Sequence, residues 1–171
     1  MAIKIGREKF MKKSILLLIT MVLLGGLIGC TRPAGKEEVE SRVGYIVIDG
    51  NDLQFKEIEI VEWEDRDKMD EYNLSDDDME ATGFVFIEKP GSLNYQLAEE
   101  VDYIFTDVHL NFIEEEDGDR IYHTRKKEEF LRHLAEYDLN DIPLEEQTIP
   151  YFIEISGGKV TSIREEFKYT I

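Results

Sequence analysis

Alternating apolar and polar positions after residue 42 predict a β-hairpin. Residues 43–48 are rich in β-branched side chains, residues 49–52 have the composition of a tight turn, and residues 53–63 return as a long strand. Phe55 is out of phase with the apolar positions that follow it in this strand. The break indicates either a bulge near Lys56 or a strand whose buried face switches.

The same pattern predicts strands in the middle of the chain and a second hairpin near its end. The middle strands are expected at 83–88, 93–97 and 101–113. The closing hairpin is expected to pair 149–155 with 159–169 around the tight-turn sequence Ser156-Gly157-Gly158.

Helical periodicity is clearest at 125–137, where Thr124 is the expected N-cap. Its apolar side chains share one face: Phe130, Leu131, Leu134 and Tyr137. Shorter patterns predict brief helices at 65–73 and 75–81. We therefore predict an α+β fold with a mainly antiparallel, curved sheet or small barrel, one clear helix at about 125–137 and one or two short helices.

The first 29 residues have the three parts of an export signal: a basic start, an apolar middle and a small-residue end. Residues 15–28 form an uncharged run of 14 residues, whereas a spanning helix needs about 20. The end, Leu27-Ile28-Gly29-Cys30, resembles the lipobox of bacterial lipoprotein precursors. This resemblance implies cleavage before Cys30 and attachment of a diacylglyceryl group to its sulfur. Met11 precedes two lysines and is an alternative start to Met1.

We expect a lipidated, flexible tether at 30–41 and one globular domain at 42–171. Two acyl chains are enough for stable membrane attachment, so the anchor implies a protein on the extracytoplasmic face of the cell membrane. Cys30 is the only cysteine. Its lipidation would leave no thiol for a disulfide or for thiol chemistry.

The charge of the chain is strongly acidic, with 38 acidic against 20 basic side chains and a net charge of −18. Without residues 1–29, the balance is 37 against 15, a net charge of −22. Such a chain repels phosphate backbones, which argues against nucleic-acid binding. It favours a basic protein or peptide of the envelope as partner.

A second resemblance covers most of the region after the tether. It is carried by core and turn residues: Asp78-Met79, Gly83-Phe84, Tyr103-Ile104-Phe105, Thr124, Glu129-Phe130, Pro150 to Glu154, Gly158-Lys159-Val160 and Ser162-Ile163. These pieces resemble an uncharacterised small extracytoplasmic domain of Gram-positive bacteria. The resemblance implies no activity and no catalytic or binding residue.

Acidic clusters are the candidate metal ligands, because calcium prefers several oxygen ligands. The first cluster is Asp76, Asp77, Asp78 and Glu80, and the second runs from Glu114 to Asp119. Neither has EF-hand spacing, and in so acidic a chain we interpret both as solvated turns. We therefore predict no cofactor, with calcium as the alternative.

Other chemistry finds little support in the sequence. His109, His123 and His133 lack zinc-type spacing, and we expect structural or surface roles for them. No serine-nucleophile motif is present, and Gly157-Gly158-Lys159 lacks the rest of a phosphate loop.

The sequence leaves three hypotheses for the function. The leading one is a lipid-anchored module without enzymatic activity that binds or shields something at the cell envelope. The alternatives are a carboxylate-based cell-wall hydrolase and a calcium-dependent structural domain.

Overall fold

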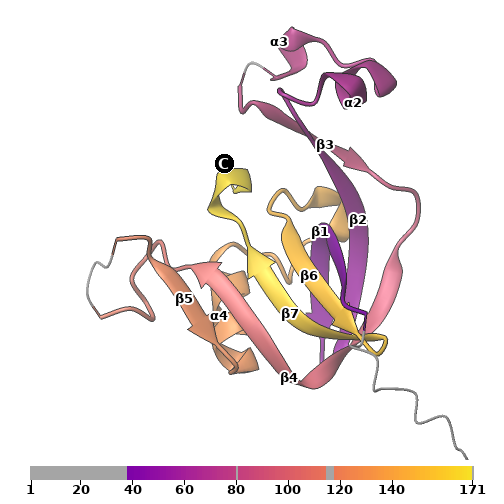
Figure 1. Cartoon of the computed structure of the whole chain (residues 1–171). Helices are drawn as coiled ribbons and strands as arrows, with labels where there is room; N and C mark the ends of the chain where they lie inside the picture. The colour runs from indigo at the N-terminus through magenta and orange to yellow at the C-terminus, as the bar shows by residue number, and fades with distance from the viewer. Residues whose placement is uncertain (1–37, 80, 115–117, 171) are drawn as a thin grey trace, which may run out of the picture. The chain divides into compact units, whose positions relative to one another are not determined.

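The computed structural model describes residues 38–79, 81–114 and 118–170 (Figure 1). The α+β prediction is confirmed: the elements, in chain order, are β1 Glu40–Asp49, β2 Asp52–Glu62, α2 Arg66–Glu71, α3 Asp76–Met79, β3 Phe84–Glu88, β4 Leu93–Thr106, β5 Ile121–Thr124, α4 Lys127–Glu136, the 3-10 turn η1 Leu144–Glu146, β6 Tyr151–Ser156, β7 Lys159–Glu165 and the 3-10 turn η2 Phe167–Tyr169. The predicted anchor, Cys30, lies outside the described residues, as does most of the expected tether.

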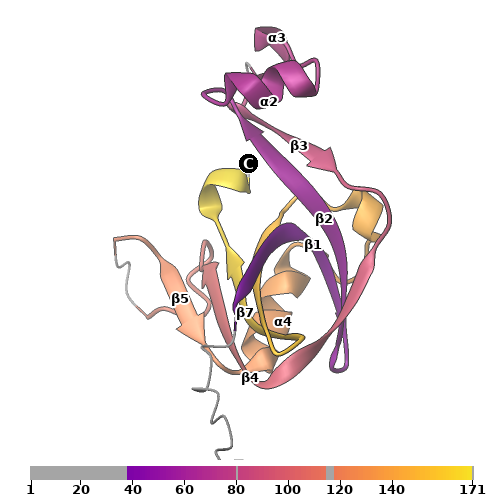
Figure 2. The ribbon, with the colours of Figure 1, turned by 45° about the vertical axis from the view of Figure 1, so that its right-hand side comes forward.

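The strands form a seven-stranded sheet in the order β3-β2-β1-β6-β7-β4-β5. An additional pairing of β2 with β4 closes β1, β2, β4, β7 and β6 into a ring. Among the described strands, β4 and β7 are the one parallel pair, and the other pairings are antiparallel as expected. Figure 2 looks into the ring, with α4 behind it.

The first hairpin forms as predicted, with Gly50 at φ +57° in the turn between β1 and β2. The register is regular through Lys56, so β2 has no bulge there against β1. Instead its buried face switches: Phe55 packs in the main core, whereas Ile58 packs on the opposite face with Tyr45. The second of the two sequence-based alternatives is therefore correct.

The predicted strands 93–97 and 101–113 are one strand, β4, whose pairing with β7 shifts between Leu97 and Asp102. The expectation that strand structure continues to residue 113 is wrong. The Asp107 carboxylate accepts hydrogen bonds from three successive backbone N–H groups, those of residues 111–113, at 2.8–2.9 Å. These bonds replace the pairing of a strand and fold the chain into a loop.

The clear helix forms, but it starts later than predicted and Thr124 is not its N-cap. Lys126 holds the cap position, and Thr124 ends the short edge strand β5, which the sequence did not predict. The Thr124 hydroxyl instead accepts from the Lys126 N–H at 3.1 Å and donates to Glu129 at 2.6 Å. Phe130 and Leu134 are buried, as the helical pattern predicted.

The closing hairpin also forms, with Gly157 and Gly158 at φ +56° and +78° in its turn. Because both turn residues have positive φ, glycine is the residue that this turn favours. The prediction of a strand to residue 169 is wrong, since β7 ends at Glu165 and the chain continues into η2. Both short helices, α2 and α3, are present.

Large apolar side chains from the inner faces of the strands fill the ring together with α4. Phe130 of α4 stacks on Tyr103 at 4.7 Å between ring centroids and meets Tyr151 edge-on at 5.7 Å. Burial of such residues is the main source of stability in a domain without disulfides. In the described part of the chain, no helix has the length and apolarity to cross a membrane.

Candidate binding groove

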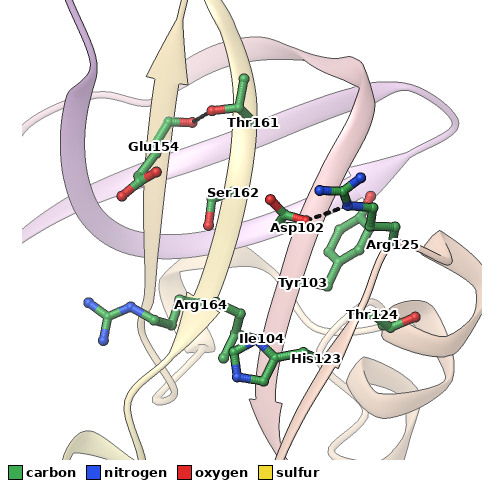
Figure 3. Close-up of a pocket in the computed structure, with 10 residues that line it drawn as sticks. All are labelled: Asp102, Tyr103, Ile104, His123, Thr124, Arg125, Glu154, Thr161, Ser162 and Arg164. Atoms are coloured by element: carbon green, nitrogen blue, oxygen red, sulfur yellow. Dashed lines mark hydrogen bonds and ion pairs between the residues drawn. The ribbon is translucent and has the colours of Figure 1, made fainter.

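A groove of about 650 Å³ crosses β5, β4, β7 and β6 on the face of the sheet opposite the core (Figure 3). Ten residues line it: Asp102, Tyr103, Ile104, His123, Thr124, Arg125, Glu154, Thr161, Ser162 and Arg164. Its volume lies in the range of small-molecule sites. The lining is mostly polar and carries both signs of charge.

Strand alternation explains why these side chains face outward. Tyr103, Ile153 and Ile163 point into the core and are 0–2 % exposed. Their neighbours along each strand must then point to the other face. The groove is thus the reverse side of a part of the sheet that packs on the core, and this packing holds its backbone in place.

The strand register arranges the groove side chains in two rows. In the first row Glu154 lies opposite Ser162, and Ser162 lies opposite Asp102. In the second row Arg164 lies opposite Ile104, and Ile104 lies opposite His123. We call these the carboxylate row and the cationic row.

Charged groups in the groove differ in how they are paired. Arg125 binds Asp102 at 2.7 Å and Glu100 at 3.2 Å, and all three side chains are more than half exposed. Arg164, in the cationic row, pairs with Glu166 and lies over the ring of Phe152.

The Glu154 carboxylate has no ion-pair partner among the described residues, although it is exposed within the groove. Only its backbone carbonyl is engaged, by the Thr161 hydroxyl at 3.3 Å (Figure 3). Glu154 is therefore the carboxylate of the groove that is most available to a ligand.

A second polar cluster lies inside the core. His133 Nε2 is 3.2 Å from Glu165 Oε2, and both side chains are 1 % exposed. The same Glu165 oxygen accepts from the Thr106 N–H at 2.9 Å, while the Tyr151 hydroxyl lies 3.5 Å from His133 Nε2. Burial, reinforced by the charge of Glu165, raises the pKa of Tyr151 well above its usual value. Because no substrate can reach this cluster, its role is structural.

Asp107 belongs to the same region and is 1 % exposed. Burial alone would raise its pKa, but the three backbone N–H donors and the nearby His133 outweigh burial and lower it. The loop after β4 is thus organised around an ionised carboxylate.

The first predicted cation cluster lies in α3, and the structure gives two of its carboxylates other partners. Asp76 pairs with Arg66 at 2.5 Å, and Asp78 accepts from both the backbone N–H and the hydroxyl of Ser75. These bonds to Ser75 lower the pKa of Asp78. Asp77 is exposed, and Glu80 lies outside the described residues.

Nowhere in the described ranges do three His, Cys, Asp or Glu side chains come together as a group that could hold a metal ion. Part of the second acidic cluster, residues 115–117, lies outside these ranges. Calcium binding stays a prediction.

Residues 64–79 form a distinct feature that we call the acidic lobe. It contains α2 and α3 at the far ends of β2 and β3 (Figure 1), and it packs around the buried residues Val61, Met69 and Met79. Several of its carboxylates are exposed and have no ion-pair partner among the described residues: Glu64, Asp67, Asp70, Glu71 and Asp77.

The sequence alone did not reveal the groove. Glu154, Ser162 and Asp102 lie on three strands, and only the register of β6, β7 and β4 places them in one row. His133 was expected to have a structural or surface role. It is buried, which fits the structural role.

Comparison with known proteins adds no functional assignment. The resemblances to lipoprotein precursors and to a small extracytoplasmic domain stay predictions. The chain matches no protein-family model, and no curated protein or solved structure is similar to it, so a function must rest on the geometry described above.

Proposed function

We propose that this protein is a lipid-anchored, extracytoplasmic lipoprotein that acts without enzymatic activity and binds a basic protein or peptide at the cell envelope. In this proposal Cys30 carries the lipid and the tether keeps the domain near the membrane. Because β1 begins at Glu40, the proposed tether has nine residues, 31–39, and if flexible it would have a root-mean-square reach of about 16 Å.

The distribution of charge is the observation that carries the proposal. Most cations of the described residues are engaged in ion pairs within the domain: Arg42, Lys56, Arg66, Lys68, Lys89, Arg125, Lys126, Arg164 and Lys168. The acidic lobe, in contrast, presents carboxylates that no described cation neutralises.

Unpaired carboxylates on one projecting feature create a negative potential that attracts a positively charged partner and orients it. Salt screens this attraction, with a Debye length of about 8 Å at physiological ionic strength. Binding through the lobe should therefore weaken as salt is raised.

The lowered pKa values of two carboxyl groups favour a binding role over carboxylate-based hydrolysis. Such a hydrolase needs a carboxyl group whose pKa is raised, so that it can donate a proton. Ion pairs with Lys68 and Lys89 and a hydrogen bond from Tyr72 lower the pKa of Glu59 to about 2. Lys126 and Thr124 do the same for Glu129, also to about 2. These groups are fixed as carboxylates.

Cross-linking in intact bacteria tests the proposal with the full chain carrying a C-terminal tag. A lobe variant, D67N/D70N/E71Q/D77N, removes four exposed charges. The matched control, E128Q/D141N/E145Q/E146Q, removes four exposed charges elsewhere.

We expect cross-linked envelope proteins of basic character, lost in the lobe variant and retained in the control. Raising the salt before cross-linking should reduce their yield. The proposal is wrong if both variants recover the same partners as the unmodified protein, or if no partner is basic.

A further inference from the structure

The groove described above differs from the acidic lobe, because it places opposite charges at a fixed spacing. Its carboxylate row and its cationic row are two residues apart along the strands. At about 3.3 Å per strand residue, the rows are separated by about 6.6 Å. Because Glu154 and Arg164 also lie on neighbouring strands about 4.8 Å apart, their Cα atoms are about 8 Å apart. A ligand that satisfies both rows must carry a positive and a negative group at a comparable distance.

We propose that the groove binds a short peptide with free termini, with its ammonium group at Glu154 and its carboxylate at Arg164. One extended residue spans about 3.3–3.6 Å, so a dipeptide or tripeptide, about 7–11 Å long, carries its terminal charges at a distance comparable to that between Glu154 and Arg164. This inference is independent of the acidic lobe and of the basic partner proposed for it.

The two ends of the groove offer different chemistry to such a ligand. Glu154 has no ion-pair partner among the described residues and can accept an ammonium group without losing a bond. Arg164 can bind a carboxylate through its planar guanidinium, although it must share this group with Glu166. That ion pair is about 40 % exposed on both sides, and exposed pairs are weak enough to rearrange on binding.

The floor between the rows suits the body of a small peptide. Ser162 lies in the centre of the carboxylate row, while Ile104 is the apolar position of the cationic row (Figure 3). In that view Ser162 lies between Glu154 and Asp102, and Arg164 and His123 lie below them. The serine hydroxyl can hydrogen-bond to a peptide group, and the isoleucine can pack against a small side chain.

A simple ion fits the groove less well. A lone anion would meet the Glu154 carboxylate as well as the field of a strongly acidic chain. A lone cation would leave Arg164 unused. Only a ligand with both charges gains from both rows.

Calorimetric titration of the full-length protein in detergent micelles tests the proposal, with Ala-Ala as the probe. Two capped probes, N-acetyl-Ala-Ala and Ala-Ala amide, each remove one terminal charge. We expect Ala-Ala to bind and each cap to weaken binding about two- to fivefold, the range for a partly exposed ion pair. No heat of binding from Ala-Ala at 10 mM, taken as about the weakest measurable affinity, would overturn the proposal, as would equal affinity for the capped probes.

Two groove variants identify which side chain binds which terminus of the probe. Glu154→Gln should weaken Ala-Ala about two- to fivefold but should not weaken N-acetyl-Ala-Ala, because that probe has no ammonium group for Glu154 to bind. Arg164→Gln should weaken Ala-Ala but should not weaken Ala-Ala amide, which has no carboxylate for Arg164 to bind. Controls outside the groove, Lys159→Gln and Glu145→Gln, should bind Ala-Ala as the unmodified protein does. If the controls lose as much affinity as the groove variants, the assignment of this groove is wrong.

Discussion

Replacing Glu165 with alanine tests the structural role of the buried polar cluster. The Glu165 carboxylate is 1 % exposed, lies 3.2 Å from His133 Nε2 and accepts the Thr106 N–H at 2.9 Å. Glu165→Ala leaves both of these groups buried without their partner. It also leaves a cavity where the side chain was.

The expected loss of folding free energy is large. Each buried polar group that loses its hydrogen-bond partner costs about 1–3 kcal/mol. Glu165→Ala leaves two such groups, on His133 and Thr106, so the expected loss is about 2–6 kcal/mol. A domain of ordinary stability, about 5–15 kcal/mol, would lose a large share of its folding free energy.

Urea unfolding of the region 38–171, followed by circular dichroism, measures the loss of folding free energy. Glu145→Ala, at an exposed position, is the matched control and should change stability by less than about 0.5 kcal/mol. The double variant His133→Ala with Glu165→Ala adds a coupling energy, expected between about 0.5 and 3 kcal/mol. A loss below about 1 kcal/mol for Glu165→Ala, or strict additivity with His133→Ala, would refute the reasoning.

Two further perturbations are predicted from local geometry. Because the folded pKa of Glu59 is about 2, below its unfolded value of 4.5, its ion pairs with Lys68 and Lys89 stabilise the domain above pH 4.5 and are lost as the pH falls toward 2. Glu59→Gln should flatten the acid side of the stability curve by about 1–2 kcal/mol in urea unfolding at several pH values, and an unchanged slope would contradict this. Gly44→Ala would place a Cβ against the backbone carbonyl oxygen of Lys56 and 2.8 Å from the Phe55 ring, and it should cost about 1–3 kcal/mol. Gly118→Ala, whose Cβ meets nothing within 4 Å, should cost little, and equal unfolding midpoints for the two variants would contradict this.

Local signals predicted the hairpins and the main helix well. Gly157 and Gly158 supply the positive φ angles that their turn requires, so the turn can be recognised without knowing the rest of the fold. Likewise, the face of α4 follows from the spacing of Phe130 and Leu134. In both cases the local conformation is determined by a few residues that are neighbours in the sequence.

The ends of the strands were harder to predict because tertiary contacts decide them. The residues after Thr106 keep a strand-like composition, yet the Asp107 carboxylate captures the backbone N–H groups that a strand would pair. β5 was missed for a related reason, since four residues carry too little pattern to predict a strand.

The groove depends on the pairing of strands that are far apart in the sequence. β4 and β7 are about 60 residues apart in the chain, and their parallel pairing brings Asp102 beside Ser162. A shift of one residue in that register would move the charged side chains to the other face. Sequence patterns indicate that each strand has an outer face, but they do not say which outer faces will be neighbours.

The most direct test of the proposed anchor and location is intact-mass spectrometry of the protein recovered from the membrane fraction of the bacteria that produce it. The account predicts a chain that begins at Cys30 and carries a diacylglyceryl group, and it predicts that Cys30→Ser abolishes this species. A membrane-bound chain that retains residues 1–29 without lipid, or a Cys30→Ser variant that is still processed and membrane-bound, would contradict it.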